Sequence, residues 1–227
     1  MTPAEPLITL KNVTHRFGPK TVLTDVNLAI NAGDFIAITG RNGGGKTTLL
    51  RLMLKLIKPT HGSVDYASPA PSFGYLPQKN TIDQRFPVTV EEVVGMGLKR
   101  KAFGRRDEAQ RERLREAIAL VGLDDVAQNP IGEVSGGQLQ RALLARAIVT
   151  EPTVLVMDEP LSYIDRQFQK RFYDIVEQLR QRTTIVLVSH DMTTLGEMAN
   201  HHLIVDGAVT VCHSHRHFRQ LSCELDP

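Results

Sequence analysis

A glycine-rich segment in the first quarter of the chain carries residue types suited to binding an anion. Residues 40–47 read Gly-Arg-Asn-Gly-Gly-Gly-Lys-Thr, which fits the pattern G-x-x-x-x-G-K-[ST]. Backbone N–H groups in such a loop point inward around phosphate oxygens, and the dipole of a following helix adds positive potential. Lys46 is expected to reach the β- and γ-phosphates, and the Thr47 hydroxyl to ligate Mg²⁺. The spacing therefore predicts a site for a nucleoside triphosphate.

The segments on either side of these glycines support this interpretation. Residues 35–39 form a short, mostly apolar run typical of a buried strand, and residues 47–57 contain no Gly or Pro and favour a helix. The alternative is a glycine-rich turn that only caps an ordinary helix. A strand before the loop and a helix after it favour the phosphate loop.

Acidic and imidazole side chains follow two later apolar runs. Asp158 and Glu159 come directly after residues 153–157, and His190 follows residues 184–189. Asp158 suits a Mg²⁺ shell, Glu159 suits polarising an attacking water, and His190 suits a hydrogen bond to a γ-phosphate. The alternatives are an acidic helix cap before Pro160 and a histidine that caps a turn. Because a phosphate loop is present, we interpret all three as site residues.

Two further segments have a functional and a structural interpretation. The sequence Ser-Gly-Gly-Gln at 135–138 precedes a predicted helix over 139–149 and resembles a second anion-binding nest. A head-to-tail dimer would give this nest a use, because it could face the nucleotide of the other subunit. Phe17, just before Gly18, is either a core aromatic or a ring that stacks on adenine.

The order of the predicted elements indicates an α/β fold. Alternating apolar and polar residues over 7–10, 22–23 and 26–30 predict an antiparallel sheet, and short strands follow at 63–66 and 73–76. Residues 88–134 look helical and open with a capping-box pattern at Thr89. Beyond residue 153, apolar strands alternate with a helix over 166–182, which predicts a parallel sheet whose ligands bind at the carboxyl ends of the strands.

Composition excludes several classes of protein. The chain has 227 residues, 41% hydrophobic and 23% charged, with a formal net charge of +2. This charge does not favour nucleic acid, and we interpret the basic run over 99–106 as a solvated loop rather than a binding arm. No apolar run reaches the length of a membrane span, and the first residues lack the pattern of a secretion signal. Both cysteines lie near the C-terminus and suggest no disulfide framework. We expect a cytoplasmic protein.

With these motifs in this order, residues 7–210 resemble the ATP-binding subunits of ABC transporters. The resemblance implies a P-loop NTPase parallel-sheet core with an antiparallel β subdomain and an inserted α-helical subdomain. It implies one domain over 1–227, in which 1–78 and 153–210 form the nucleotide-binding core, about 79–152 the helical subdomain and signature helix, and 211–227 a C-terminal tail. The implied cofactors are ATP and Mg²⁺.

The resemblance also implies a role for each matching residue. Glu159, His190 and Gln78, the glutamine of the Q-loop, are the expected catalytic residues, and Thr47, Gln78 and Asp158 the expected Mg²⁺ ligands. Asp165 ends the D-loop. The signature spans Val134–Gln138, and its residues Ser135–Gln138 contact the γ-phosphate bound by the other subunit. The full set expected to contact nucleotide is Phe17, Gly40, Arg41, Asn42, Gly43, Gly44, Gly45, Lys46, Thr47, Thr48, Ser135, Gly136, Gly137, Gln138 and Asp165.

Some positions depart from the family pattern. Val134 stands where leucine is usual, Arg41 replaces a common proline, and Tyr163 is bulkier than the small residues common there. None of these changes removes a catalytic group.

The segment 87–97 looks like the one found in importers of zinc, manganese or iron, and the segments 158–165 and 200–217 look most like bacterial zinc-uptake ATPases. We therefore expect a peripheral subunit on the cytoplasmic face of the inner membrane. It would form a homodimer around two ATP molecules, bind permease subunits and cooperate with a secreted metal-binding protein, without nucleic acid. The alternatives are an importer of iron chelates or cobalamin, a lipid or envelope complex, and a soluble ABC ATPase of DNA repair or translation.

The sequence Cys-His-Ser-His-Arg-His at 212–217 has two interpretations. It is either a disordered polar tail or a sensor of cytosolic metal, and the second is considered because thiolate and imidazole are zinc-type ligands.

Overall fold

The computed structural model describes residues 5–78, 86–98, 106–162, 164–189 and 194–212. The chain divides into two compact units, Met1–Ser72 with Arg182–Pro227, and Phe73–Gln181. The boundaries predicted for the helical subdomain and the tail remain predictions.

An antiparallel sheet opens the first unit, as the alternating pattern predicts. Its strands are β1 (Ile8–Phe17), β2 (Lys20–Ile30) and β4 (His61–Tyr66), in the order β2-β1-β4. Leu10 lies opposite Leu28 on one side and Val64 on the other. Ile8, Leu10 and Val13 are buried while Lys11 and Asn12 are exposed, so one face of this sheet is covered and the other is solvated.

The other strands of the first unit form a mainly parallel sheet. β7 (Thr184–Val188), β3 (Phe35–Thr39) and β8 (His201–Val205) run parallel, and β9 (Val209–Cys212) pairs antiparallel with β8. Every residue of β3 and β7 is buried, which is why both strands read as continuous apolar runs. A short helix, α6 (Thr194–Met198), precedes β8.

Helix α1 (Lys46–Met53) ends four residues before the predicted end at Ile57. The reason is a Schellman motif, in which Leu56 N–H donates to Arg51 O at 2.9 Å and Lys55 N–H to Leu52 O at 3.0 Å. Lys55 takes the left-handed conformation, φ 53°, that glycine usually supplies at this position. The Tyr66 hydroxyl donates to Met53 O at 2.7 Å, and the Lys55 ammonium lies 3.9 Å from the centre of the Tyr66 ring. A local backbone motif, supported by tertiary contacts from Tyr66, therefore ends the helix although no glycine marks its end.

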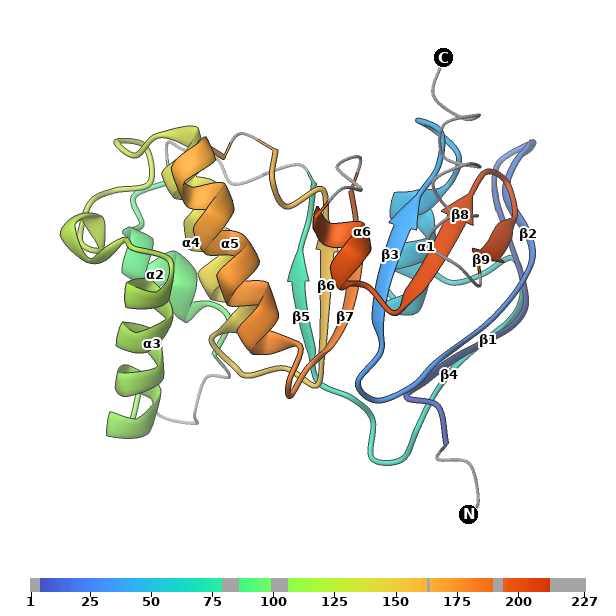
Figure 1. Cartoon of the computed structure of the whole chain (residues 1–227), viewed down its shortest axis with the longest axis horizontal. Helices are drawn as coiled ribbons and strands as arrows, with labels where there is room; N and C mark the ends of the chain where they lie inside the picture. The colour runs from blue at the N-terminus through green and yellow to red at the C-terminus, as the bar shows by residue number, and fades with distance from the viewer. Residues whose placement is uncertain (1–4, 79–85, 99–105, 163, 190–193, 213–227) are drawn as a thin grey trace. The chain divides into compact units, whose positions relative to one another are not determined.

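The second unit combines two parallel strands with a group of helices (Figure 1). β5 (Phe73–Leu76) pairs with β6 (Val154–Asp158), and Leu76 lies opposite Met157. The helices are α2 (Val90–Gly95), α3 (Glu108–Leu120), α4 (Gly136–Ile148) and α5 (Arg166–Leu179), with a short 3-10 helix at Asp124–Val126. The predicted capping box of α2 is present, since Thr89 Oγ1 accepts from Glu92 N–H and Glu92 accepts from Thr89 N–H.

Amphipathic packing positions α5 in this unit. Its five predicted inward residues are all buried: Phe168, Phe172, Ile175, Val176 and Leu179. Burying each such side chain contributes about 1.5–3 kcal/mol, so this stripe is enough to fix the face that α5 presents to its neighbours. The observed architecture confirms the α/β class with an antiparallel sheet and an inserted helical segment.

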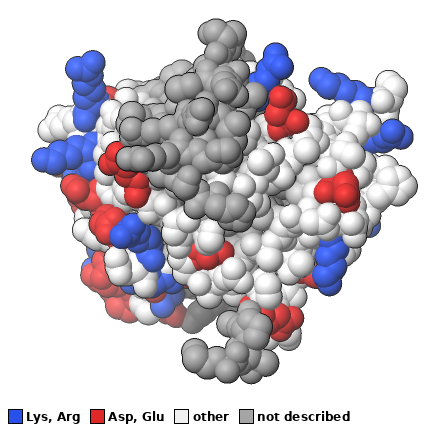
Figure 2. Space-filling model, turned by 45° about the vertical axis from the view of Figure 1, so that its right-hand side comes forward, with Lys and Arg blue, Asp and Glu red and all other residues white. Residues whose placement is uncertain are grey.

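Two surface properties bear on function. Within the described residues, no helix combines the length and apolar character that a membrane crossing requires. On the face drawn in Figure 2, basic and acidic side chains are interspersed.

Candidate functional site

The predicted phosphate loop lies between β3 and α1, and close approach of another strand explains its glycines. A Cβ added to Gly44 would lie 2.6 Å from Val205 O at the end of β8, and one added to Gly40 would overlap the same carbonyl. Gly40, Gly43 and Gly45 have φ of 141°, 80° and 106°, where a side chain is strained. The loop can take this shape only with these glycines.

Lys46 is oriented inside the loop. Its ammonium donates to Gly40 O at 2.6 Å and Arg41 O at 3.1 Å, and the residue is 7% exposed. Gly44 N–H donates to Arg41 O at 3.0 Å, which tightens the turn. Thr47 and Thr48 follow in the first turn of α1, both half-buried. A cation fixed at the N-terminus of a helix is suited to receive phosphate oxygens.

The turn between β8 and β9 supports the loop, and sequence reasoning missed it. Gly207 N–H donates to Gly44 O at 2.9 Å, and Thr24 N–H on β2 donates to Gly207 O at 2.8 Å. Gly207 thus links the phosphate loop to the antiparallel sheet by backbone hydrogen bonds. The pair Asp206-Gly207 between two apolar segments is a hairpin signal, so the turn could have been found from the sequence, although its contact with the loop could not.

Phe17 ends β1 with its side chain 51% exposed. Its ring meets the buried His15 ring edge-to-face, with centroids 4.6 Å apart and planes at 82°. An exposed aromatic ring whose orientation is fixed by contact with a buried ring can stack on a base. This geometry favours the adenine-stacking interpretation over that of a core aromatic.

In the second unit, the predicted carboxylates stand at the end of β6. Asp158 is the last residue of the strand and 1% exposed, and Glu159 is half-buried. Glu159 has φ 50°, a conformation that non-glycine residues rarely adopt and that often marks functional sites. Because β5 and β6 are parallel neighbours with Leu76 opposite Met157, Gln78 and Glu159 each lie two residues beyond that pair. The structure therefore places these polar residues just beyond the carboxyl ends of β5 and β6, at the same end of the strand pair.

The predicted start of the signature helix at Leu139 is wrong, because α4 begins at Gly136. Ser135 is its N-cap, with Ser135 Oγ accepting from Gln138 N–H at 3.1 Å and Gln138 Oε1 accepting from Ser135 N–H at 2.8 Å. Ser135-Gly136-Gly137-Gln138 is thus a capping box and the first helical turn, not a separate nest before the helix. The amides of Gly136 and Gly137 occupy the first two helical positions, whose N–H groups have no partner within a helix.

Asp165 is the N-cap of α5, and its carboxylate accepts from Phe168 N–H at 2.8 Å. A capping role is compatible with the predicted nucleotide contact, because an exposed carboxylate retains further lone pairs. His190 lies outside the described residues, as does Tyr163.

Of the segment 212–217 proposed as a metal sensor, the structure describes Cys212 alone. Cys212 belongs to β9, is 4% exposed and lies opposite His202, whose Nε2 is 2.8 Å from Gly196 O. Burial raises the pKa of the Cys212 thiol, which disfavours the thiolate that binds zinc. Cys212 is therefore the last residue of β9. His213, His215 and His217 fall outside the described residues, and the described residues contain no group of three potential metal ligands.

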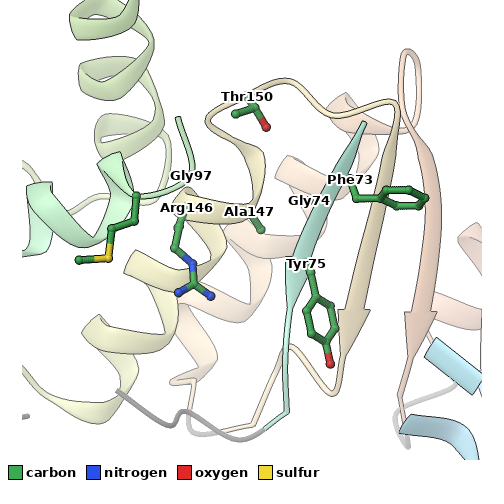
Figure 3. A pocket seen from close by; sticks show the side chains of 8 residues that line it. Phe73, Gly74, Tyr75, Gly97, Arg146, Ala147 and Thr150 are labelled. Atoms are coloured by element: carbon green, nitrogen blue, oxygen red, sulfur yellow. The ribbon is translucent and has the colours of Figure 1, made fainter. Parts of the chain in front are cut away.

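A pocket of about 240 Å³ opens in the second unit (Figure 3). It lies between β5, the end of α2 and the last turn of α4. Its lining comprises Phe73, Gly74, Tyr75, Met96, Gly97, Arg146, Ala147 and Thr150. Met96 is 56% exposed, and burial lowers the pKa of the Arg146 guanidinium. Among the described residues, no carboxylate forms an ion pair with Arg146. This surface offers an apolar side chain beside a partly desolvated cation.

A strand, a glycine loop closed around a lysine and a helix N-terminus define a P-loop nucleotide-binding protein, and comparison with known proteins narrows the class. Residues 23–162 match the ABC transporter family. The zinc import ATP-binding protein ZnuC of Hydrogenovibrio crunogenus is 38% identical over 192 residues, covering 82% of this chain and 74% of that protein. A probable metal transport system ATP-binding protein of Thermotoga maritima is 36% identical over 188 residues, covering 82% and 75%.

Solved structures agree with these relatives. A putative metal-chelate type ABC transporter in an inward-facing conformation has a TM-score of 0.80 at 26% identity, covering 94% of this chain and 85% of that one. The dimeric ATP-binding cassette MJ0796, in a post-hydrolysis state with ADP and Pi, has a TM-score of 0.77 at 27% identity, covering 89% and 96%. The chain belongs to the ABC transporter family. It is an ATP-binding cassette, and its activity is that of an ATPase.

Proposed function

We propose that this ATPase powers the import of zinc through a membrane permease. The observation that carries the proposal is the phosphate loop organised around Lys46, in a chain that is 36–39% identical to zinc and metal transport ATP-binding proteins over most of its length. The loop supports ATP binding, and the relatives support the cargo. The subunit would work as a peripheral protein on the cytoplasmic face of the inner membrane, supplied by a secreted metal-binding protein.

The chemistry assigned to the site follows from the residues at its edges. We place Glu159 as the base that polarises the attacking water, with Gln78 and His190 as further catalytic residues. Thr47, Gln78 and Asp158 would hold Mg²⁺, and a hydroxyl, an amide oxygen and a buried carboxylate are the hard oxygen donors that this ion prefers. Bound there, Mg²⁺ neutralises charge that develops on the phosphates.

The nucleotide would be enclosed by two subunits. Gly40–Thr48 and Phe17 of one subunit would bind ATP, and the Ser135–Gln138 turn and Asp165 of the other would complete the site, as a head-to-tail arrangement allows. The dimeric cassette MJ0796 supports this arrangement. ATP would favour the closed dimer because only that state makes contacts with γ-phosphate from both sides, and hydrolysis would release it.

The pocket beside Met96 is our proposed contact for the permease. An exposed methionine next to a half-buried arginine would receive an apolar segment that carries a carboxylate. The helices of the second unit would then transmit the ATP-dependent motion to the membrane.

Growth under zinc chelation tests the cargo. In cells that depend on this chain, Lys46→Ala should stop zinc uptake, and added zinc should restore growth where manganese and iron do not. Unchanged zinc uptake would reject zinc as the cargo while leaving the ATPase assignment in place. Rescue by iron chelates would favour the second candidate, a chelate importer, which the likeness to the metal-chelate type transporter supports.

A further inference from the structure

His15 on strand β1 is a buried polar residue that the proposed chemistry does not use. The residue is 7% exposed, and neither of its ring nitrogens has a hydrogen-bond partner among the described residues. Most buried polar groups in folded proteins are hydrogen-bonded, and a group that is not lowers stability. The imidazole therefore needs an explanation other than the stability of the strand.

The contact between His15 and Phe17 provides that explanation. Residues two apart in a strand lie on the same face, and these two rings meet edge-to-face with their centroids 4.6 Å apart. Phe17 is the last residue of β1 and is 51% exposed. An exposed phenylalanine at the end of a strand would otherwise exchange between staggered rotamers. The His15 ring limits this exchange.

The backbone around His15 is itself fixed. Arg16 N–H donates to Thr60 Oγ1 at 3.1 Å, and Thr60 N–H donates to Thr14 O at 2.9 Å. The pairing with β2 shifts register between Val13 and His15 and again between His15 and Arg16. Irregularities of this kind change the direction in which side chains point. The local backbone therefore determines where the imidazole lies.

The same sheet contacts the phosphate loop. His15 lies opposite Leu23 in the pairing of β1 with β2, and Leu23 is fully buried. A Cβ added to Gly45 would lie 2.8 Å from Leu23 Cδ2, so the leucine side chain lies directly against the loop. A Phe17 ring that His15 orders therefore has a defined position relative to the loop that would bind the phosphates.

We propose that His15 is a positioning residue, which orders the Phe17 ring for stacking on adenine before ATP binds. Order in the free protein reduces the conformational entropy that binding would otherwise lose, so the affinity for ATP rises. Because both of its nitrogens are buried, His15 itself touches no nucleotide. This inference rests on the proposed contact between Phe17 and adenine.

The test measures binding of a ribose-labelled fluorescent ATP analogue to the full chain, with inorganic tripolyphosphate, which has no base, as a competitor. Phe17→Ala should weaken binding of the analogue by about tenfold or more, because base–aromatic stacking is lost. His15→Ala should weaken it roughly fivefold, because the Phe17 ring remains but is less ordered. The affinity for tripolyphosphate should stay unchanged in both variants, since the phosphate loop is intact.

Three further variants distinguish positioning from stability. Val13→Ala is the matched control, because Val13 is fully buried in the same strand two residues before His15. It should lower the melting temperature and leave the affinity for the analogue unchanged. His15→Phe keeps an aromatic ring and removes the unpartnered nitrogens, so it should retain the wild-type affinity without a loss of melting temperature. Combined with Phe17→Ala, His15→Ala should have no further effect on affinity.

His15→Val suits a strand and also lacks the ring, so it carries the same comparison if His15→Ala fails to fold. Wild-type affinity in the folded variants without the imidazole ring would overturn the inference. An equal loss of affinity in Val13→Ala, or a further loss when His15→Ala is combined with Phe17→Ala, would also overturn it. Wild-type affinity in Phe17→Ala would instead reject the proposed contact with adenine.

Discussion

The backbone of Glu159 is the least ordinary feature of the site at the scale of single residues. Its left-handed conformation follows directly after a fully buried strand and a buried Asp158. A conformation of this kind costs on the order of 1–3 kcal/mol and persists where the surrounding structure fixes it. Gln140 on α4 contributes to that fixing, because its Nε2 donates to Pro160 O at 3.3 Å. This contact holds the backbone that follows Glu159.

Glu159→Gln should retain ATP binding and lose turnover by roughly 10²- to 10⁴-fold, because an amide cannot accept the proton of the attacking water. Phosphate release and binding of a fluorescent ATP analogue measure the two properties. Glu177→Gln on the surface of α5 serves as the control and should hydrolyse ATP normally. Hydrolysis by Glu159→Gln near the wild-type rate would show that another group is the base.

At the scale of elements, the second unit has two capping boxes, and a comparison of variants in them distinguishes a loss of stability from a loss of function. Ser135→Ala and Thr89→Ala each remove a side-chain acceptor at a helix N-terminus, and each should cost about 1 kcal/mol of stability. Only Ser135→Ala should also lower ATP-dependent dimerisation and the ATPase rate of the isolated subunit. Thermal melts and phosphate release on both variants provide the comparison. Equal ATPase losses in the two would reject a nucleotide role for the signature turn.

We expect the stability of the protein to depend on pH in the alkaline range because of Tyr66, whose hydroxyl contacts the end of α1. Burial raises the pKa of Tyr66 to about 12 from 10.0, so the folded protein holds the phenolic proton more tightly than the unfolded chain. The contribution of Tyr66 is therefore complete below pH 10 and is lost as the pH rises toward 12. The free energy of unfolding of wild type should fall more steeply over this range than that of Tyr66→Phe. Parallel curves in denaturant titrations would contradict this.

How far the sequence predicts each element depends on where its signal lies. The phosphate loop, the apolar strands and the inward face of α5 were predictable because local patterns encode them. The early end of α1 was not predictable, since Lys55 stands where glycine is usual and Tyr66, which stabilises the turn, lies on strand β4. The predicted start of α4 was wrong because Gly136 and Gly137 disfavour a helix by their own propensity, whereas the capping box of Ser135 stabilises a first helical turn there. The support of Gly44 by Gly207 is a tertiary contact without a local signal.

At the scale of the whole molecule, a cassette must couple hydrolysis to a partner, and the Met96 pocket gives that coupling a testable position. Arg146→Glu should lower metal uptake in cells but leave the ATPase rate of the isolated subunit near that of wild type, because Arg146 lies in the pocket and not in the site. Reversing its charge would repel a docking carboxylate. Arg180→Glu, at the C-cap of α5, is the control. Normal uptake with Arg146→Glu would place the permease contact elsewhere.

Radioactive zinc uptake with Glu159→Gln as the only copy of the chain tests the central claim most directly, because this variant should bind ATP without hydrolysing it. We expect uptake at the level of a strain without the chain, while Glu177→Gln restores the wild-type rate at equal protein abundance. Zinc uptake at the wild-type rate by a variant that hydrolyses no ATP would contradict the account.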